Sequence, residues 1–253
     1  SGHVVSDHRF CEQHVLRDDE TASRHSTFAA VIRAGMTSHE LENTPERLLA
    51  RAYALRGDDP YETLKLYADW AETYDHTMLD GLAYRSPLQI AALAASTEKR
   101  RDVRVLDVGC GTGLLANSLR AQGFSRVDGL DYSAPMLSVA QREGRIDRAF
   151  LRDLNERLGM GGECYDILTS TGTFTHGHVG AKCLPELLAL LVPGGHLICT
   201  VHRDVWDEGG FGTGLQALAD ARVAVVRSRD ADRMFADEKE PSGWYVVVEK
   251  TSY

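Results

Sequence analysis

Glycines at alternate positions give this chain its clearest chemical signal. Gly109, Gly111 and Gly113 follow an apolar, β-branched run at 103–108. Glycine lets the backbone turn sharply and leaves no side chain between the main chain and a ligand. Apolar residues recur at helical spacing from Leu114, so the unpaired N–H groups of a helix start lie beside the same turn. The stretch therefore predicts a strand, a turn that binds a polar or anionic ligand, and a helix.

The spacing of these glycines distinguishes between two classes of ligand, a dinucleotide and an adenosine compound without a pyrophosphate. A dinucleotide fingerprint needs Gly or Ala where this chain has Leu114. Asp107 instead lies near the strand end, and a carboxylate there suits a ligand with an ammonium group and no pyrophosphate. The string LDVGCGTG resembles motif I of the class I S-adenosylmethionine-dependent methyltransferases, which implies S-adenosyl-L-methionine as cofactor and S-adenosyl-L-homocysteine as product. A nicotinamide-dependent oxidoreductase and a non-catalytic cofactor-binding module remain as alternatives.

Two more carboxylates end predicted strands. Asp131 follows the run 126–130, and a carboxylate at such a strand tip accepts hydrogen bonds from the ribose hydroxyls of an adenosine. Asp153 stands at the tip of the run 148–154, where the resembled family binds the adenine amino group; capping of the following turn is the alternative. The resemblance also implies that Tyr132 and Met136 pack against the adenine.

An aromatic stripe precedes the glycine turn. Tyr67, Trp70 and Tyr74 are three and four residues apart on a helix predicted to start at Pro60 and continue to residue 79, so they share one face. Such a stripe is often core packing. The segment YADWAETYD, however, resembles an element of small-molecule methyltransferases that forms a lid over the methionine part of the cofactor. Aromatic faces also stabilise a sulfonium cation, by about 0.5–2 kcal/mol.

Three histidines follow two predicted strands. His176 and His178 lie in the polar loop after the strand predicted at 165–171, and His202 ends the next strand. In an open α/β sheet, the active site lies among the loops at the carboxyl ends of the parallel strands. A neutral imidazole could act as general base there, and ordinary loop hydrogen bonding is the alternative. Two histidines one residue apart could also bind a metal, but we expect none, because no Cys, Asp or Glu stands nearby at ligand spacing.

These patterns define the predicted site. The predicted catalytic residues are His176, His178, His202 and Tyr67, with Asp75 as a further candidate base. The predicted cofactor-binding residues are Trp70, Tyr74, Asp107, Gly109, Cys110, Gly111, Gly113, Leu114, Asp131, Tyr132, Met136, Asp153, Leu154 and Thr171.

The bulk composition restricts the partners. The chain has 253 residues, 43% of them hydrophobic, and a net charge of −9, so nucleic acid and anionic membrane surfaces are disfavoured. Its five cysteines lack C-x-x-C spacing and are expected to be reduced. No apolar stretch approaches about 18 residues, and the polar N-terminal residues lack the apolar core that is typical of a signal peptide. We therefore expect a cytoplasmic protein, monomeric or homodimeric, with a small-molecule partner.

The resemblance implies the architecture. It predicts a Rossmann-like α/β fold, with a seven-stranded mixed sheet, helices on both faces and an antiparallel last strand. We expect a mobile N-terminal arm at 1–26, a helical lid or substrate-capping region at 27–98 and a cofactor-binding domain at 99–253. A glycine-rich loop at 204–214 is expected to form a second lid.

The expected reaction is methyl transfer from S-adenosylmethionine by in-line displacement. The acceptor would be an O, N or C nucleophile of a small molecule, which includes natural-product tailoring. The aromatic element and GTFTHGHVG resemble the Williams-Beuren-region methyltransferase-like branch and its bacterial relatives. A peptide or protein methyltransferase is the alternative within the same chemistry.

Overall fold

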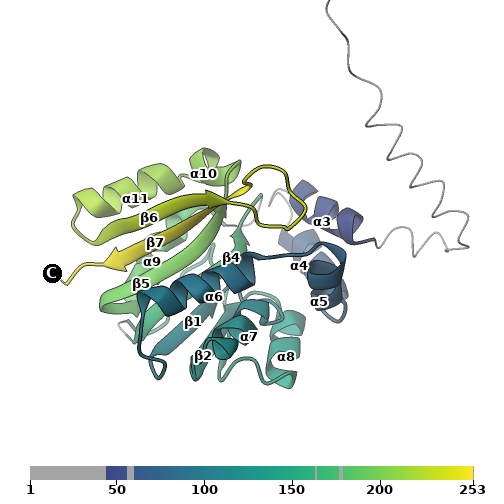
Figure 1. Cartoon of the computed structure of the whole chain (residues 1–253), viewed down its shortest axis with the longest axis horizontal. Helices are drawn as coiled ribbons and strands as arrows, with labels where there is room; N and C mark the ends of the chain where they lie inside the picture. The colour runs from purple at the N-terminus through teal and green to yellow at the C-terminus, as the bar shows by residue number, and fades with distance from the viewer. Residues whose placement is uncertain (1–43, 56–59, 163, 177–178, 253) are drawn as a thin grey trace, which may run out of the picture. The chain divides into compact units, whose positions relative to one another are not determined.

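A seven-stranded mixed sheet forms the centre of the described chain (Figure 1). The computed structural model describes residues 44–55, 60–162, 164–176 and 179–252. The strands are β1 (Arg104–Val108), β2 (Arg126–Asp131), β3 (Ala149–Leu151), β4 (Tyr165–Phe174), β5 (Leu191–His202), β6 (Ala224–Asp232) and β7 (Gly243–Lys250). Their order is β3-β2-β1-β4-β5-β7-β6; β1 to β5 pair in parallel, and β7 is antiparallel to both β5 and β6. The predicted mixed sheet is therefore confirmed.

Helices precede and follow the glycine turn. Those before β1 are α3 (Pro45–Ala54), α4 (Pro60–Trp70), α5 (Tyr74–His76), the π-helical turn η1 (Thr77–Gly81) and α6 (Ser86–Thr97). Those after it are α7 (Leu114–Ala121), α8 (Ala134–Arg142), the 3-10 turn η2 (Ala181–Cys183), α9 (Leu184–Leu190), α10 (Val205–Glu208) and α11 (Phe211–Asp220). None of the described helices is both long and apolar enough to span a membrane.

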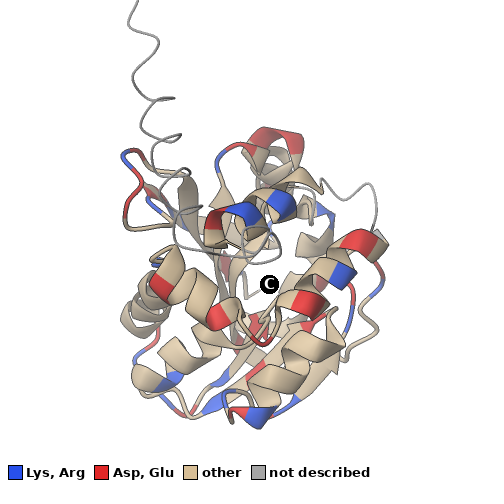
Figure 2. Cartoon of the chain, turned by 90° about the vertical axis from the view of Figure 1, so that its right-hand side faces the viewer, with Lys and Arg blue, Asp and Glu red and all other residues tan. Residues whose placement is uncertain are grey.

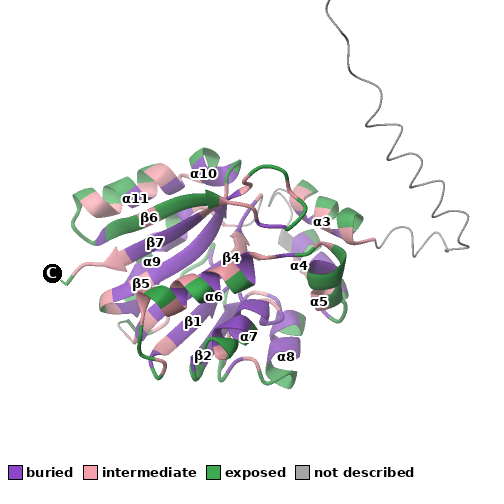
Figure 3. Ribbon diagram, viewed as in Figure 1, coloured by how far each residue is buried: buried purple, intermediate pink, exposed green. Residues whose placement is uncertain are grey.

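The sheet separates two apolar cores. Successive side chains of a strand point to opposite faces, and on β1 Val105 packs with α6, α7 and α8 while Leu106 packs with α9, α10 and α11. Both side chains are fully buried. Figure 3 shows the same contrast, with the central strands mostly buried and the edge strand β6 mostly exposed. A sheet covered on both faces explains the continuous apolar runs in the sequence.

A third apolar cluster joins the N-terminal helices to the sheet end. It contains Leu48 of α3, Trp70 of α4 and Leu114 of α7, together with Met234 and Phe235 from the segment between β6 and β7. Because α7 starts at the glycine turn, this cluster fixes the helices beside that turn.

A polar contact strengthens the same connection. The Asp75 carboxylate accepts hydrogen bonds from the Thr112 hydroxyl and from the Arg145 guanidinium. Asp75 therefore ties α5 to the glycine turn. It is held in an ion pair and is a poor candidate for the base that the sequence suggested.

Several local predictions were wrong. The helix expected to run from Pro60 to residue 79 ends at Trp70, because Thr73 N–H bonds back to the Trp70 carbonyl and closes a turn. The strand expected at 165–171 continues to Phe174. Ser133 stands at the N-cap of α8, where a serine hydroxyl usually caps the helix, but its hydroxyl makes no capping bond.

The expected lid loop at 204–214 is largely helical. Trp206 on α10 and Phe211 on α11 are 9% and 1% exposed, and both belong to the core on the α9 face. A Cβ at Gly212 would lie 2.9 Å from Trp206 Nε1, so this glycine serves close packing. The expectations for residues 1–43 lie outside the described part of the chain.

Candidate functional site

A cavity opens at the carboxyl ends of β1, β2 and β4, above the glycine turn. Its wall contains ten of the predicted site residues, namely Tyr67, Tyr74, Gly109, Gly111, Asp131, Tyr132, Met136, Asp153, Leu154 and Thr171. It also contains Thr63, Leu130, Arg152, Asn155, Gly172, Thr173 and Val179. The crevice beyond the strand ends is the expected ligand position in an open parallel sheet.

Asp131 contributes a buried carboxyl group to the wall. Its two carboxylate oxygens accept the N–H groups of Gly111 and Ser133, each at 2.8 Å. Burial raises the pKa of this carboxyl, and these backbone donors oppose the rise. Because each oxygen has further lone pairs, the side chain keeps accepting capacity toward the cavity.

The glycine turn needs glycine for two different reasons. Gly109 has φ +66°, and a Cβ there would lie 2.0 Å from the Thr173 Oγ1. Gly111 has φ +53°, but a Cβ there would meet nothing within 4 Å. Gly109 is therefore required for contact between β1 and β4, whereas the space beside Gly111 belongs to the cavity.

Replacing Gly111 with alanine is expected to weaken S-adenosylhomocysteine binding by about tenfold or more, because a methyl group would enter the cavity and ordered hydrogen bonds there would be lost. The left-handed backbone costs alanine roughly 1–2 kcal/mol of stability. Gly144→Ala is the matched control, since Gly144 has φ +64°, open space around it and no place in the cavity wall. Calorimetry and thermal melts of both variants would test this. Equal binding losses in the two variants would contradict the cavity role of Gly111.

Aromatic residues cover the cavity. Tyr67 and Tyr74 line it, and Trp70 contacts both, with ring centroids 6.0 Å from Tyr67 and 4.9 Å from Tyr74. Trp70 itself is 3% exposed and belongs to the third apolar cluster. The stripe is thus both a core element and a cavity wall, with Trp70 on the core side.

Five predicted cofactor residues do not line this cavity: Trp70, Asp107, Cys110, Gly113 and Leu114. Asp107 is 1% exposed beneath the turn, where Thr169 Oγ1 lies 3.4 Å from its carboxylate. Leu114 packs in the same apolar cluster as Trp70. A Cβ at Gly113 would lie 3.0 Å from the Arg145 Cβ, so this glycine permits close packing. The expectation of an ammonium contact by Asp107 therefore does not match its buried position.

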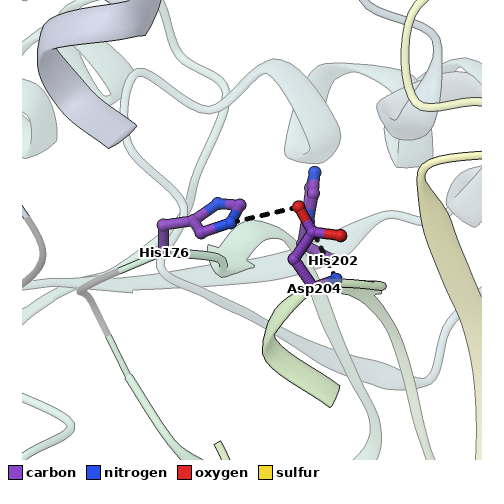
Figure 4. A group of neighbouring side chains, drawn as sticks. All are labelled: His176, His202 and Asp204. Carbon is purple, nitrogen blue, oxygen red and sulfur yellow. Dashed lines mark hydrogen bonds and ion pairs between the residues drawn. The ribbon is translucent and has the colours of Figure 1, made fainter. Parts of the chain in front are cut away.

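His176 and His202 come together beside the cavity with Asp204 (Figure 4). The His176 Nε2 lies 3.4 Å and the His202 Nδ1 3.8 Å from the same carboxylate oxygen, Asp204 Oδ2. The ring of Tyr53, on α3, lies 5.2 Å from the His176 ring and 5.8 Å from the His202 ring. His176 is three residues beyond Thr173 of the cavity wall. His178 lies outside the described residues.

The protonation of these groups limits their chemistry. Burial lowers the pKa of His202 and the neighbouring His176 lowers it further, while the Asp204 and Glu238 carboxylates oppose the shift, so the net effect favours the neutral imidazole. Burial raises the pKa of Tyr53 to about 12 and raises that of Tyr67 further. Tyr67 therefore keeps its proton and could donate a hydrogen bond, but the expectation that it acts as a base is disfavoured.

Sequence reasoning missed several of these residues. Thr63 precedes Tyr67 by four positions, so the helical stripe already contained the signal. Asp204 follows His202 by two positions, but its proximity to His176 depends on the pairing of β4 with β5. Nothing in the sequence connects Tyr53 with these histidines.

The wall fits an adenosine-containing cation. The buried Asp131 carboxylate offers acceptors for ribose hydroxyls, and the open space at Gly111 admits a ligand close to the backbone. The buried Tyr132 hydroxyl has no partner among the described residues. Aromatic faces from Tyr67 and Tyr74 lie across the cavity, where a sulfonium would gain from them.

Fold and site together define the class I S-adenosylmethionine-dependent methyltransferases, and this chain belongs to that family. The family profile described as a methyltransferase domain matches residues 106–199. The chain is 34% identical to Homo sapiens Methyltransferase-like protein 27 over 189 residues, which cover 73% of this chain and 76% of the relative. The protein is therefore an S-adenosylmethionine-dependent methyltransferase.

Other relatives match over shorter stretches. A mitochondrial ubiquinone biosynthesis O-methyltransferase of Candida albicans is 29% identical over 184 residues, covering 64% of this chain and 55% of the relative. Among solved structures, a Mesorhizobium loti methyltransferase has a TM-score of 0.50 with 19% identity, covering 64% of this chain and 98% of that one. A Methanococcus maripaludis methyltransferase has a TM-score of 0.53 with 15% identity, covering 76% and 94%. These structures share the fold.

Proposed function

We propose that this chain transfers the methyl group of S-adenosylmethionine to a nucleophile of a small molecule, including natural-product tailoring among its uses. The observation that carries this proposal is the aromatic wall of the cavity. Tyr67 and Tyr74, from the N-terminal helices, line the cavity and cover it. A cavity covered in this way suits a small acceptor better than an extended peptide. The Candida albicans relative that is named for ubiquinone biosynthesis supports the same acceptor class.

The proposed roles follow from the geometry. Asp131 would hold the ribose, Asp153 the adenine amino group, and Tyr132, Met136 and Leu154 would flank the adenine. The cofactor supplies a methyl group already activated on a sulfonium, so the protein mainly has to align the nucleophile with the sulfur–methyl bond.

The acceptor would lie toward His176 and His202. Helices α3 to α6 would form the substrate-capping region, with Tyr67 and Tyr74 over the reacting atoms. A histidine base for a departing proton stays a prediction from the sequence.

The charge distribution supports a small partner. Figure 2 shows acidic and basic residues interspersed on the described part of the face that includes α3, α4 and α5. The net charge of −9 also repels a polyanion at long range. A nucleic-acid acceptor is therefore disfavoured.

Methyl transfer from labelled S-adenosylmethionine tests the proposal. The full chain would be incubated with the small-molecule fraction and, separately, with the protein fraction of a cell extract. We expect label in the small-molecule fraction, and no label when Asp131 is replaced by alanine. Label confined to protein would overturn the proposal in favour of the peptide alternative. Binding of S-adenosylhomocysteine without any transfer would support a non-catalytic module instead.

A further inference from the structure

Two imidazoles and one carboxylate meet at the ends of neighbouring strands. His176 lies two residues beyond the end of β4, His202 ends β5, and Asp204 stands two residues after His202. Phe174 of β4 pairs with Val201 of β5, so the sheet itself sets the separation of the two histidines. One ligand atom from each of the three side chains lies within 4.8 Å of the other two.

The separations are long for hydrogen bonds but suit a shared cation. N–H···O bonds usually measure about 2.7–3.2 Å. The two imidazole nitrogens instead lie 3.4 Å and 3.8 Å from the same oxygen, Asp204 Oδ2. Ligands about 2.0–2.2 Å from a tetrahedral Zn²⁺ are roughly 3.3–3.6 Å from one another. Small side-chain adjustments would therefore place all three atoms around one ion, and the ion would replace the 3.3 Å hydrogen bond that the His202 Nδ1 accepts from the Asp204 N–H.

The surroundings favour a cation as well. His202 is 12% and His176 25% exposed, while the 70% exposed Asp204 side chain is free to adjust its position. The Tyr53 ring packs against both imidazoles and shelters them from water. The Glu238 carboxylate also acts electrostatically on His202, although its own hydrogen bonds hold it to Met234 N–H and Ser242.

We propose that His176, His202 and Asp204 bind one divalent transition-metal cation at the carboxyl ends of β4 and β5. Imidazole nitrogens with a carboxylate oxygen suit Zn²⁺, Mn²⁺, Fe²⁺ or Co²⁺, and three protein ligands leave at least one position open. The sequence expectation of no metal depended on the lack of a nearby carboxylate at ligand spacing. Asp204 supplies that carboxylate through the fold.

The consequence for catalysis rests on the proposed function. An open position beside the cavity would take an oxygen of the acceptor, and the cation would polarise it. The acceptor class would then be molecules that present a hydroxyl. In the transfer, the sulfur–methyl bond breaks and the oxygen–methyl bond forms. The hydroxyl proton passes to solvent, and S-adenosylhomocysteine remains.

Cation binding by the full chain tests the site directly. Chelator-treated protein would be titrated with Zn²⁺ or Mn²⁺ by calorimetry, and with Co²⁺ by visible absorption. We expect one site in the wild type whose affinity falls at least about 10–100-fold in Asp204→Asn and in His202→Ala. His76→Ala is the matched control, because His76 also lies near a carboxylate, Asp80, at 3.9 Å, but is 81% exposed and belongs to no cluster of three ligand residues in the described part of the chain.

Two further measurements distinguish failure of the cation site from misfolding of a variant and from failure of the proposed function. S-adenosylhomocysteine binding should persist in Asp204→Asn, which shows that the variant is folded, since Asp204 lies outside the cavity wall. Wild-type protein that binds no cation would overturn the site, as would Asp204→Asn and His202→Ala variants that bind it like the wild type. Loss of methyl transfer alone would bear on the proposed function and leave the cation site standing.

Discussion

Replacing Asp131 with alanine is expected to weaken S-adenosylhomocysteine binding at least about 100-fold. Hydrogen bonds to a charged partner contribute roughly 1.5–3 kcal/mol each, and two ribose hydroxyls would lose theirs together. The substitution also removes the acceptor for the Gly111 N–H, which helps to shape the glycine turn. Calorimetric titration of the wild type and the variant measures the effect.

Two other aspartates calibrate this result. Asp153 lines the cavity with a less buried carboxylate that accepts the Asn155 N–H at 2.8 Å. Asp153→Ala should therefore cost about tenfold in affinity, for one hydrogen bond. Asp230 lies exposed on β6, and Asp230→Ala should leave binding unchanged. An Asp131→Ala variant that binds like Asp230→Ala would remove Asp131 from the cofactor site.

The cofactor half of the site could be predicted because its signals are local. β2 has the expected bounds, Arg126–Asp131, and the carboxylate at its tip lies in the cavity wall. A strand, its terminal acid and the turn beside it are contiguous in the sequence, so residue types alone specify them. Gly109 and Gly111 illustrate the same point, since both have the positive φ that glycine allows.

The other half depends on tertiary contacts. Asp204 is 28 positions from His176, and only the pairing of β4 with β5 brings them together. Tyr53 reaches the same point from α3, across more than a hundred residues of sequence. No periodicity or spacing within one segment carries such information.

Glycine composition misled the prediction for 204–214. Clustered glycines are typical of loops, yet Gly210 serves as the left-handed N-cap of α11, with φ +72°. Gly212 and Gly214 lie inside this helix, against Trp206 and Ala181 respectively. Small residues in a helix also allow its neighbours to approach closely. Composition alone does not distinguish a glycine that serves close packing from a glycine in a flexible loop.

Replacing Asp107 with asparagine is expected to stabilise the ligand-free protein at neutral pH, with Tm higher by about 3 °C or more. The Asp107 carboxyl is 1% exposed, and its Oδ2 has no partner among the described residues. Burial raises the pKa of this carboxyl well above its ordinary value. The folded protein therefore binds the proton more tightly than the unfolded chain, and its free energy of unfolding falls as pH rises between the two pKa values.

The asparagine side chain does not titrate, so only the wild-type protein gains or loses stability through this position as the pH changes. The difference in Tm between variant and wild type should be small below the unfolded pKa of about 3.9, grow as pH rises, and level off above the raised pKa. Asp166→Asn is the opposite control, because the Asp166 carboxylate accepts the Arg104 N–H at 2.9 Å and pairs with Arg100, so its loss should destabilise. A destabilised Asp107→Asn variant would mean that the charged carboxylate has a favourable partner in solution. Loss of S-adenosylhomocysteine binding by this variant is a separate outcome, and it would mean that Asp107 contacts the ammonium group of the ligand, as first expected from the sequence.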